Sequence, residues 1–213
     1  METQKDILIR VIDYIGRKLI AAEKELTELD SMGDADCGSG VRRGFEAVQN
    51  ISAELPQLEP CDLLKKIGFT LAYTIGGTSG AMLGTGFIET GKSIGDNRQP
   101  EIKDWIGALE NALTVIKRRG GNTQVGDKTL VDSLEPAVET MKKILESSPE
   151  TSDMGTILEA GYMAAKEGSD RTVDMIAKKG RASYLGERSR GNRDPGSLVI
   201  VLMFEAALEA LRK

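Results

Sequence analysis

The sequence predicts an all-α domain, and three observations support this fold class. Apolar residues recur at helical spacing along most of the 213 residues. No stretch alternates with period two for long enough to form a strand, and breaks with glycine or proline separate the helical stretches. The length suits one domain covering residues 1–213, because no linker and no fixed-period repeat divides the chain.

Eight helices are expected, packed side by side. The spacing i, i+3, i+4, i+7 is clear near the N-terminus, at Leu8, Val11, Ile12, Ile15 and Leu19. The expected helices cover residues 4–28, 39–53, 61–74, 79–94, 102–118, 127–146, 153–177 and 196–212. Pro136 lies inside the sixth, so it should kink that helix or mark a second start capped by Asp132 or Ser133.

The composition excludes several classes of function. Lys and Arg total 28 and Asp and Glu total 33, which gives a net charge of −5, and aromatic residues make up only 4%. A nucleic-acid binder would instead carry a basic surface and stacking aromatics. The chain has no histidine, which excludes Ser-His-Asp and Cys-His catalysis, a phosphohistidine and the usual zinc sites. Any chemistry must therefore use carboxylates, hydroxyls, Lys, Arg and backbone amides.

The sequence also predicts a cytoplasmic location. The N-terminal residues lack the apolar core of a signal peptide. The longest apolar run, residues 198–204, is too short to span a bilayer, so no membrane contact is expected. Without an export signal, Cys37 and Cys61 are expected to be reduced thiols.

The break at residues 29–40 brings three carboxylates together. Asp30, Asp34 and Asp36 lie within seven residues, around Gly33 and Gly38. Such close carboxylates repel one another, and a hard divalent cation such as Mg²⁺ removes the repulsion. With so few protein ligands, phosphate oxygens would complete the coordination of the ion. The alternative is a helix N-cap with an Asx-turn and one solvated aspartate.

The break at residues 76–87 suits an anion. Gly76-Gly-Thr-Ser-Gly80 precedes a run that can form a helix, and free amides at a helix start together with two hydroxyls form an anion site. It lacks the ending of a P-loop. The alternative is a plain helix start capped by Thr78 or Ser79, with small residues for close packing.

Two further breaks carry charge. In Gly126-Asp127-Lys128-Thr129, Asp127 and Thr129 could cap a helix, and Lys128 could be a solvated charge. Residues 178–196 hold four arginines and two lysines, which favours an anionic ligand or an acidic partner over a solvated charge run. Asp194-Pro195-Gly196 has the pattern of an N-cap followed by proline at the first helical position. Together these breaks predict a Mg²⁺–nucleotide site for phosphoryl transfer at one end of a helical bundle.

Four motifs in this order resemble the nucleotide-binding L subunit of dihydroxyacetone kinases. They are Leu29-Asp…Gly-Asp-Ala-Asp36, Gly76-Gly-Thr-Ser-Gly80, Gly126-Asp-Lys-Thr129 and Gly180-Arg-Ala-Ser-Tyr-Leu-Gly-Glu-Arg-Ser189…Asp194-Pro-Gly196. The resemblance covers essentially the whole chain. It implies a barrel of eight antiparallel, up-and-down helices, with ADP or ATP bound at one end through two Mg²⁺ ions. It also implies a separate K subunit that holds the ketose covalently through its own histidine.

The resemblance assigns roles by position. It makes Asp30, Asp34 and Asp36 the Mg²⁺ ligands and places phosphates at Thr78 and Ser79. It implies that the residues bordering the nucleotide are Cys37, Gly38, Ser39, Gly40, Gly121, Leu130, Arg181, Asp194, Pro195 and Gly196. No catalytic residue beyond the metal ligands is expected on this chain.

Two departures from the family pattern concern the carboxylate break. The family usually has a histidine where this chain has Cys37, and the spacer between Asp30 and Gly33 is one residue shorter than is common. Cysteine is a weak hydrogen-bond donor and cannot replace imidazole toward a phosphate or ribose. We therefore expect this chain to differ from familiar members of the family in its nucleotide affinity, its metal geometry or its substrate.

The resemblance leaves the phosphoryl donor open. In one version of the family, ADP is a lasting cofactor that a phosphotransferase-system protein re-phosphorylates in place. In the other version, free ATP is the donor and exchanges at each turnover. The rival classes are an ADP-loaded regulatory module that docks on a transcription factor and a plain helical scaffold. The exact ketose and the oligomeric state, including a homodimer, stay open as well.

Overall fold

The computed structural model describes residues 2–147 and 153–212. Over these ranges the chain forms α-helices and short 3₁₀ helices and no strand, which confirms the all-α prediction. The α-helices are α1 (Gln4–Ala21), α2 (Glu23–Leu29), α3 (Cys37–Asn50), α4 (Pro60–Ile75), α5 (Gly77–Ile94), α6 (Ile102–Arg119), α7 (Val131–Ser147), α8 (Met154–Arg171) and α9 (Pro195–Leu211).

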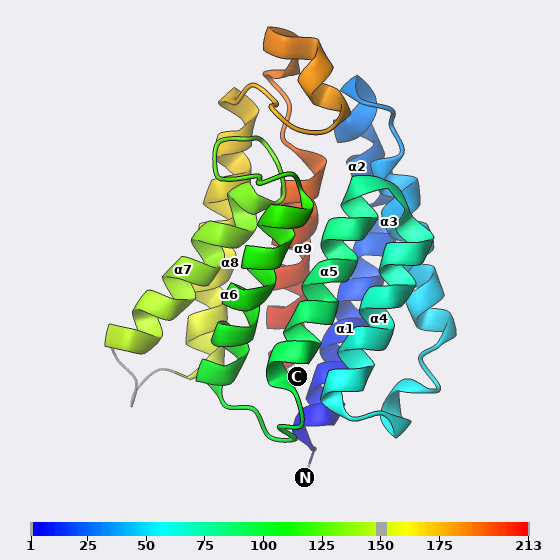
Figure 1. The fold of residues 1–213 in the computed structure, drawn as a ribbon, viewed down its shortest axis with the longest axis vertical. Coiled ribbons are helices and arrows are strands. Elements are labelled where there is room, and N and C mark those ends of the chain that lie inside the picture. Colours follow the sequence, from blue (N-terminus) through cyan, green and yellow to red (C-terminus); the bar gives the residue numbers. More distant parts are fainter. Residues whose placement is uncertain (1, 148–152, 213) are drawn as a thin grey trace.

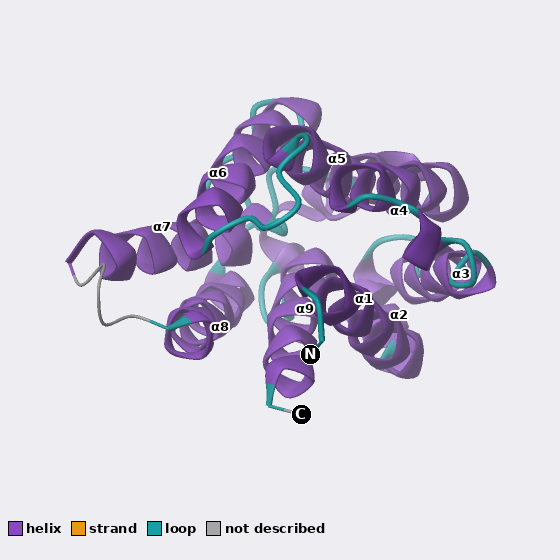
Figure 2. Ribbon diagram, turned by 90° about the horizontal axis from the view of Figure 1, so that it is seen from below, coloured by secondary structure: helices purple, strands orange, loops and turns teal. Residues whose placement is uncertain are grey.

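The helices form a closed ring in which neighbours along the chain are neighbours in space. Each helix from α3 to α9 packs against the next, and α9 packs back against α1 (Figure 2). The helices run up and down along the long axis of the molecule, with both termini at the lower end (Figure 1). This is the expected barrel. Within the described ranges, no helix is long and apolar enough to cross a bilayer.

The interior of the barrel is filled by apolar side chains. The largest fully buried side chains include Phe45, Leu19, Leu26, Leu63 and Ile67, from α1, α2, α3 and α4. Toward the end that carries the termini, residues of α1, α6, α7, α8 and α9 line an open apolar pocket of about 970 Å³. The apolar interior therefore leaves the opposite end of the barrel for polar chemistry.

Three of the expected helices differ most from the sequence prediction. The expected helix 4–28 is two helices, because the chain bends at Ala22, where φ is −84° and ψ is 4°. No glycine or proline marks this bend in the sequence. Instead, α2 lies directly on α3: a Cβ on Gly38 would fall 2.1 Å from the carbonyl oxygen of Glu23. Tertiary packing thus sets the direction of α2.

The expected helix 127–146 begins only at Val131. The preceding residues cannot be helical, because Gly126 has a φ of 92° and Lys128 a φ of 61°. The expected helix 153–177 ends at Arg171, followed by a 3₁₀ turn at Thr172–Asp174. Beyond that turn the backbone bonds to residues near Ser189 instead of continuing the helix.

Pro136 lies inside α7 and does not mark a second helix start, and neither Asp132 nor Ser133 acts as the expected cap. Thr129 does cap this helix, because its hydroxyl accepts from the Val131 N–H while the Asp132 carboxylate accepts from the Thr129 N–H. The missing N–H of Pro136 frees the carbonyl of Asp132 from the helical pattern. Gly168 of α8 approaches that carbonyl so closely that a Cβ would lie 2.0 Å from it.

Candidate functional site

Four chain segments meet at the upper end of the barrel, away from the termini (Figure 1). They are the carboxylate loop (residues 30–36), the α4–α5 turn at Gly76, the α6–α7 loop (residues 120–130) and the α8–α9 segment (residues 172–194). Each connects a helix that runs up to a helix that runs down. The loops singled out from the sequence therefore lie at one end.

The carboxylate loop brings its three aspartates together as expected. One carboxylate oxygen from each of Asp30, Asp34 and Asp36 lies within 4.8 Å of the others. Asp30 also orders the start of α3, because its Oδ2 accepts from the N–H groups of Asp36 and Cys37, both at 3.0 Å. The N-cap that was the alternative to a metal site is not formed, because Asp36 is the N-cap residue of α3 and makes no side-chain capping bond.

The electrostatics of this cluster suit a cation. Burial raises the pKa of Asp30, and the negative charges of Asp34 and Asp36 raise it further, against the lowering effect of the two backbone hydrogen bonds. Burial and the surrounding carboxylates also raise the pKa of Cys37 to about 12, so its thiol stays protonated. A divalent cation would relieve this repulsion, and the three oxygens are hard ligands of the kind that Mg²⁺ prefers. The residues present therefore fit a Mg²⁺ site.

Arg181 joins the α8–α9 segment to the carboxylate loop. The segment contains two short 3₁₀ stretches within Arg181–Ser189, divided by a kink at Gly186, and the Arg181 guanidinium forms an ion pair with Asp34. The Arg181 side chain is still 72% exposed, so it is free to turn toward a ligand. The sequence placed Arg181 at a nucleotide and Asp34 at a metal, and the structure places the two side chains together.

The start of α5 is open to solvent. Gly76 and Gly77 have φ values of 78° and 58°, which favour glycine, and Gly76 is the N-cap without any side-chain capping bond. Thr78 and Ser79 are exposed and do not cap the helix, so the cap expected in the alternative interpretation is wrong. The close packing that it also expected is present, because a Cβ on Gly84 would lie 2.5 Å from the carbonyl oxygen of Gly68 in α4. The turn lies beside α3, because Arg43 donates to the carbonyl oxygens of Thr74 and Ile75.

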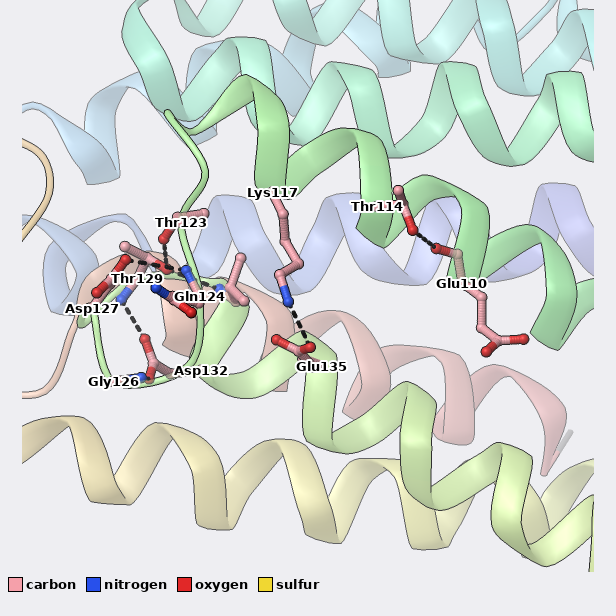
Figure 3. A network of polar contacts seen from close by, with 11 residues as sticks. Glu110, Thr114, Lys117, Thr123, Gln124, Gly126, Asp127, Thr129, Asp132 and Glu135 are labelled. Carbon is pink, nitrogen blue, oxygen red and sulfur yellow. Dashed lines mark hydrogen bonds and ion pairs between the residues drawn. The ribbon is translucent and has the colours of Figure 1, made fainter.

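The α6–α7 loop is held by buried polar side chains (Figure 3). The carboxylate of Asp132 accepts from the N–H groups of Gly126 and Thr129, at 2.6 and 2.7 Å. Asp127 accepts from the Gln124 N–H within the loop and does not cap α7. Lys128 was expected to be a solvated charge; this is wrong, because the residue is only 6% exposed. Its ammonium is enclosed by backbone carbonyls of the α8–α9 segment.

Two contacts bring the remaining predicted residues to the same end. Lys179 of the α8–α9 segment donates to the carbonyl oxygen of Gly121 at 2.7 Å. Leu130 is buried beside Gly196, where an added Cβ would lie 3.5 Å from the Cβ of Leu130. Gly38 is buried against α2 and Gly40 against Ile75, so close helix packing accounts for both glycines. Between them, the Ser39 hydroxyl donates to the Asp36 carbonyl oxygen at 3.1 Å.

Asp194 caps α9 as the sequence predicted. Its Oδ2 accepts from the Ser197 N–H at 2.6 Å, and Pro195 occupies the first helical turn. Burial raises the pKa of Asp194 to about 7, and the charges of Asp132 and Asp30 add to this effect. Because the charge of Asp30 contributes to the raised pKa of Asp194, the carboxylate loop lies on the same side of the barrel end as the start of α9.

A model of one protein family matches most of this chain. The family is described as the DAK2 domain, and the match covers residues 31–209. The chain belongs to the DAK2 domain family. This membership confirms the resemblance that the four motifs indicated. Relatives that match most of this chain are named as ADP-binding subunits of dihydroxyacetone kinases.

Two bacterial relatives match this DAK2 chain over nearly their whole lengths. The ADP-binding subunit DhaL of PEP-dependent dihydroxyacetone kinase 1 from Listeria innocua is 32% identical over 210 residues, covering 98% of both chains. The corresponding DhaL subunit from Escherichia coli is 33% identical over 203 residues, covering 92% of this chain and 93% of its own. A probable dihydroxyacetone kinase of Dictyostelium discoideum is 32% identical, but this chain spans only 33% of it.

Solved structures support the fold. The dihydroxyacetone kinase of C. freundii in its native form superposes with a TM-score of 0.73 at 25% sequence identity, covering 95% of this chain and 34% of that one. The same enzyme in complex with AMP-PNP and Mg²⁺ gives a TM-score of 0.71 at 24% identity. The helical barrel of this DAK2 domain thus corresponds to about a third of that longer kinase.

Sequence reasoning missed two residues that build this end of the barrel. Lys128 and Asp132 are buried and hold the α6–α7 loop, yet one was interpreted as a solvated charge and the other as a possible helix cap. The spacing of Asp132, three residues after Thr129, was the one available signal, since it fits a capping box. Nothing in the sequence indicates the carbonyl oxygens that surround Lys128.

Asp194→Asn tests the raised pKa of the α9 cap. A carboxyl whose pKa rises from 3.8 when unfolded to about 7 when folded favours folding at low pH, and this advantage is lost as the pH rises through 7. Asparagine keeps the cap acceptor without the ionisation. Relative to the variant, the wild-type free energy of unfolding should therefore fall by roughly 2 kcal/mol between pH 5 and pH 8.

Urea denaturation with a chelator present measures this difference. Asp62→Asn is the matched control, because the Asp62 side chain is 65% exposed and should give a difference that does not change with pH. A constant difference between wild type and Asp194→Asn across this range would contradict the assignment.

Proposed function

We propose that this DAK2 domain, acting as one unit over residues 1–213, is the phosphoryl-donor subunit of a cytoplasmic dihydroxyacetone kinase. It binds ADP or ATP with Mg²⁺ at the end of the barrel where the four connections meet. One observation carries the proposal: three carboxylates converge there, joined by an arginine from the distant α8–α9 segment. The near full-length match to relatives named as ADP-binding subunits supports the same choice of ligand.

The residues divide the work of binding. The metal ligands would be Asp30, Asp34 and Asp36. They would hold the two Mg²⁺ ions that the family resemblance implies, and phosphate oxygens would complete the coordination of these ions. Bound there, Mg²⁺ supplies neutralising charge for the phosphates. The exposed first turn of α5 offers unpaired N–H groups and the hydroxyls of Thr78 and Ser79 to the phosphates.

The remaining predicted residues would surround the rest of the nucleotide. Arg181 can exchange its ion pair with Asp34 for a bidentate contact to a phosphate, which is a strong charge-assisted interaction. The base and ribose would be bordered by Gly121, Leu130, the turn from Asp194 to Gly196 and the segment from Cys37 to Gly40. Catalysis by this chain then consists of positioning and charge stabilisation, as phosphoryl transfer requires.

The acceptor belongs to a second protein. This chain has no histidine with which to hold a ketose covalently, so dihydroxyacetone would be carried by a K subunit. The upper end of the barrel presents large exposed aromatics to such a partner: Tyr73 at the end of α4 is 93% exposed and Tyr184 in the α8–α9 segment is 90% exposed. Exposed tyrosines are enriched at protein interfaces.

The donor that best fits is a phosphotransferase-system protein that re-phosphorylates bound ADP. The relatives that match this chain from end to end are named PEP-dependent and ADP-binding, whereas the Dictyostelium kinase is about three times as long. ADP that stays with the purified chain through dialysis would support this cycle. ADP that exchanges freely would favour free ATP as the donor.

Asp34→Ala tests the metal assignment. Removing one of three converging oxygens should abolish Mg²⁺-dependent ADP binding and leave the helical fold intact, because Asp30 and not Asp34 accepts the hydrogen bonds at the start of α3. Calorimetric titration with ADP, with and without Mg²⁺, measures the binding, and far-UV circular dichroism checks the fold. Asp62→Ala, on the outer face of α4, is the control that should bind like wild type. Wild-type Mg²⁺-dependent affinity in Asp34→Ala would refute the metal site.

Arg181→Ala should change the binding of metal and of nucleotide in opposite directions. Without the guanidinium, Asp34 loses its competing partner, so Mg²⁺ alone should bind somewhat more tightly. The nucleotide should bind about tenfold to a hundredfold more weakly, because a charge-assisted bond to phosphate is lost. Arg181→Lys should recover only part of the affinity, since the planar fork is missing. Unchanged ADP affinity in Arg181→Ala would assign this arginine to the partner protein instead.

The isolated chain should not phosphorylate dihydroxyacetone, whatever nucleotide it holds. Turnover should appear only when a K subunit from a related bacterial kinase is added, and a coupled assay of dihydroxyacetone phosphate measures it. Robust turnover by the chain alone would refute the subunit assignment. A chain that retains ADP and gives no turnover with any K subunit would instead be a regulatory module.

A further inference from the structure

Lys128 occupies a position that its sequence motif does not explain. Its Nζ donates to three backbone carbonyl oxygens, those of Ser189 at 2.6 Å, Asn192 at 2.7 Å and Met175 at 3.2 Å. An ammonium group has three N–H donors, so all of them are used. The residue is only 6% exposed, and every one of these acceptors is an uncharged carbonyl. Lys128 therefore has no donor left for a phosphate.

The three carbonyls belong to one segment but to different parts of it. Met175 follows the 3₁₀ turn after α8, Ser189 ends the second 3₁₀ stretch, which follows the kink at Gly186, and Asn192 lies two residues before the α9 cap. A single ammonium thus ties both ends of the α8–α9 segment together. The stretch that it closes into a loop carries Arg181.

Two further polar contacts join the ends of this loop. The Gly191 N–H donates to the Val173 carbonyl oxygen at 2.8 Å, and the Ala177 N–H donates to the Ser189 hydroxyl at 2.9 Å. Between the ends, Gly180 and Gly186 have positive φ, and Tyr184 is exposed. Since the loop has little apolar burial of its own, its order depends on these polar contacts.

The position of Lys128 is itself fixed from the other side. Its backbone adopts a φ of 61°, which is uncommon for a residue other than glycine. The Asp132 carboxylate holds that conformation by accepting from the neighbouring N–H groups of Gly126 and Thr129. The Asp127 carbonyl oxygen accepts from the Lys178 N–H at 3.1 Å, which adds a backbone link to the same segment.

We infer that Lys128 is a positioning residue, whose ammonium shapes the α8–α9 segment so that Arg181 and the α9 cap reach the nucleotide end of the barrel. It acts through the three carbonyl oxygens and does not touch the nucleotide. The part of this inference that concerns the nucleotide rests on the proposed function. The part that concerns the loop stands on the contacts of Lys128 alone.

Lys128→Ala with chemical rescue tests both parts. The substitution removes the ammonium and leaves a space that propylammonium, which matches the lost atoms beyond Cβ, can fill. Hydrogen exchange of residues 175–192 should speed up by about tenfold or more, while α1 and α4 keep their wild-type protection. Mg·ADP affinity should fall by a similar factor. Added propylammonium should restore both, and tetramethylammonium, which has the charge but no N–H donor, should restore neither.

Two further variants keep the test decisive. Arg188→Ala is the matched control, because this arginine lies in the same segment, is exposed and should leave loop protection unchanged. Lys128→Met, which keeps the length of the side chain without its donors, replaces the alanine variant if that variant does not fold, and it should lose loop protection without responding to propylammonium.

The outcomes separate the two proposals. Wild-type protection of residues 175–192 in both Lys128 variants would overturn the positioning role. Equal rescue of Lys128→Ala by tetramethylammonium would overturn it as well, since the carbonyl contacts would then be irrelevant. If wild type fails to bind Mg·ADP, the proposed function fails, whereas loop protection and its rescue still decide the role of Lys128.

Discussion

The alternation of helix direction around a closed ring is the constraint on which the rest of this structure depends. When consecutive helices run antiparallel, every second connection lies at the same end of the barrel. The links α2–α3, α4–α5, α6–α7 and α8–α9 therefore share one end, while both termini lie at the other (Figure 1). Four motifs that are far apart in the sequence become neighbours because of this geometry.

The shared end concentrates opposite charges. The carboxylate loop contributes three aspartates with oxygens within 4.8 Å of one another, and the α8–α9 segment contributes the arginine that pairs with one of them. The raised pKa values of Asp30, Cys37 and Asp194 record the cost of burying negative groups side by side. A site with this cost, solvent-accessible amides and an exposed arginine suits a ligand that brings both metal ions and phosphates.

Buried polar groups, rather than apolar packing, give the long connections their shape. Asp132 is 1% exposed and holds the α6–α7 loop through backbone N–H groups, whereas Lys128 is 6% exposed and holds the α8–α9 segment through backbone carbonyls. Both charges are desolvated, which raises the pKa of Asp132 and lowers that of Lys128. Such groups are tolerated only when their hydrogen bonds are satisfied, and the loops supply those partners.

The sequence by itself determined the all-α class, the start of α9 at Asp194 and the clustering of Asp30, Asp34 and Asp36, because helical periodicity, capping and short spacing are local properties. Only the tertiary structure decided four other features: the bend at Ala22, the late start of α7, the pairing of Arg181 with Asp34 and the burial of Lys128. Each depends on contact with a distant backbone or side chain. Hydrogen bonds between residues 128 and 189 leave no trace in local sequence patterns, since their carbonyl acceptors are the same in every residue.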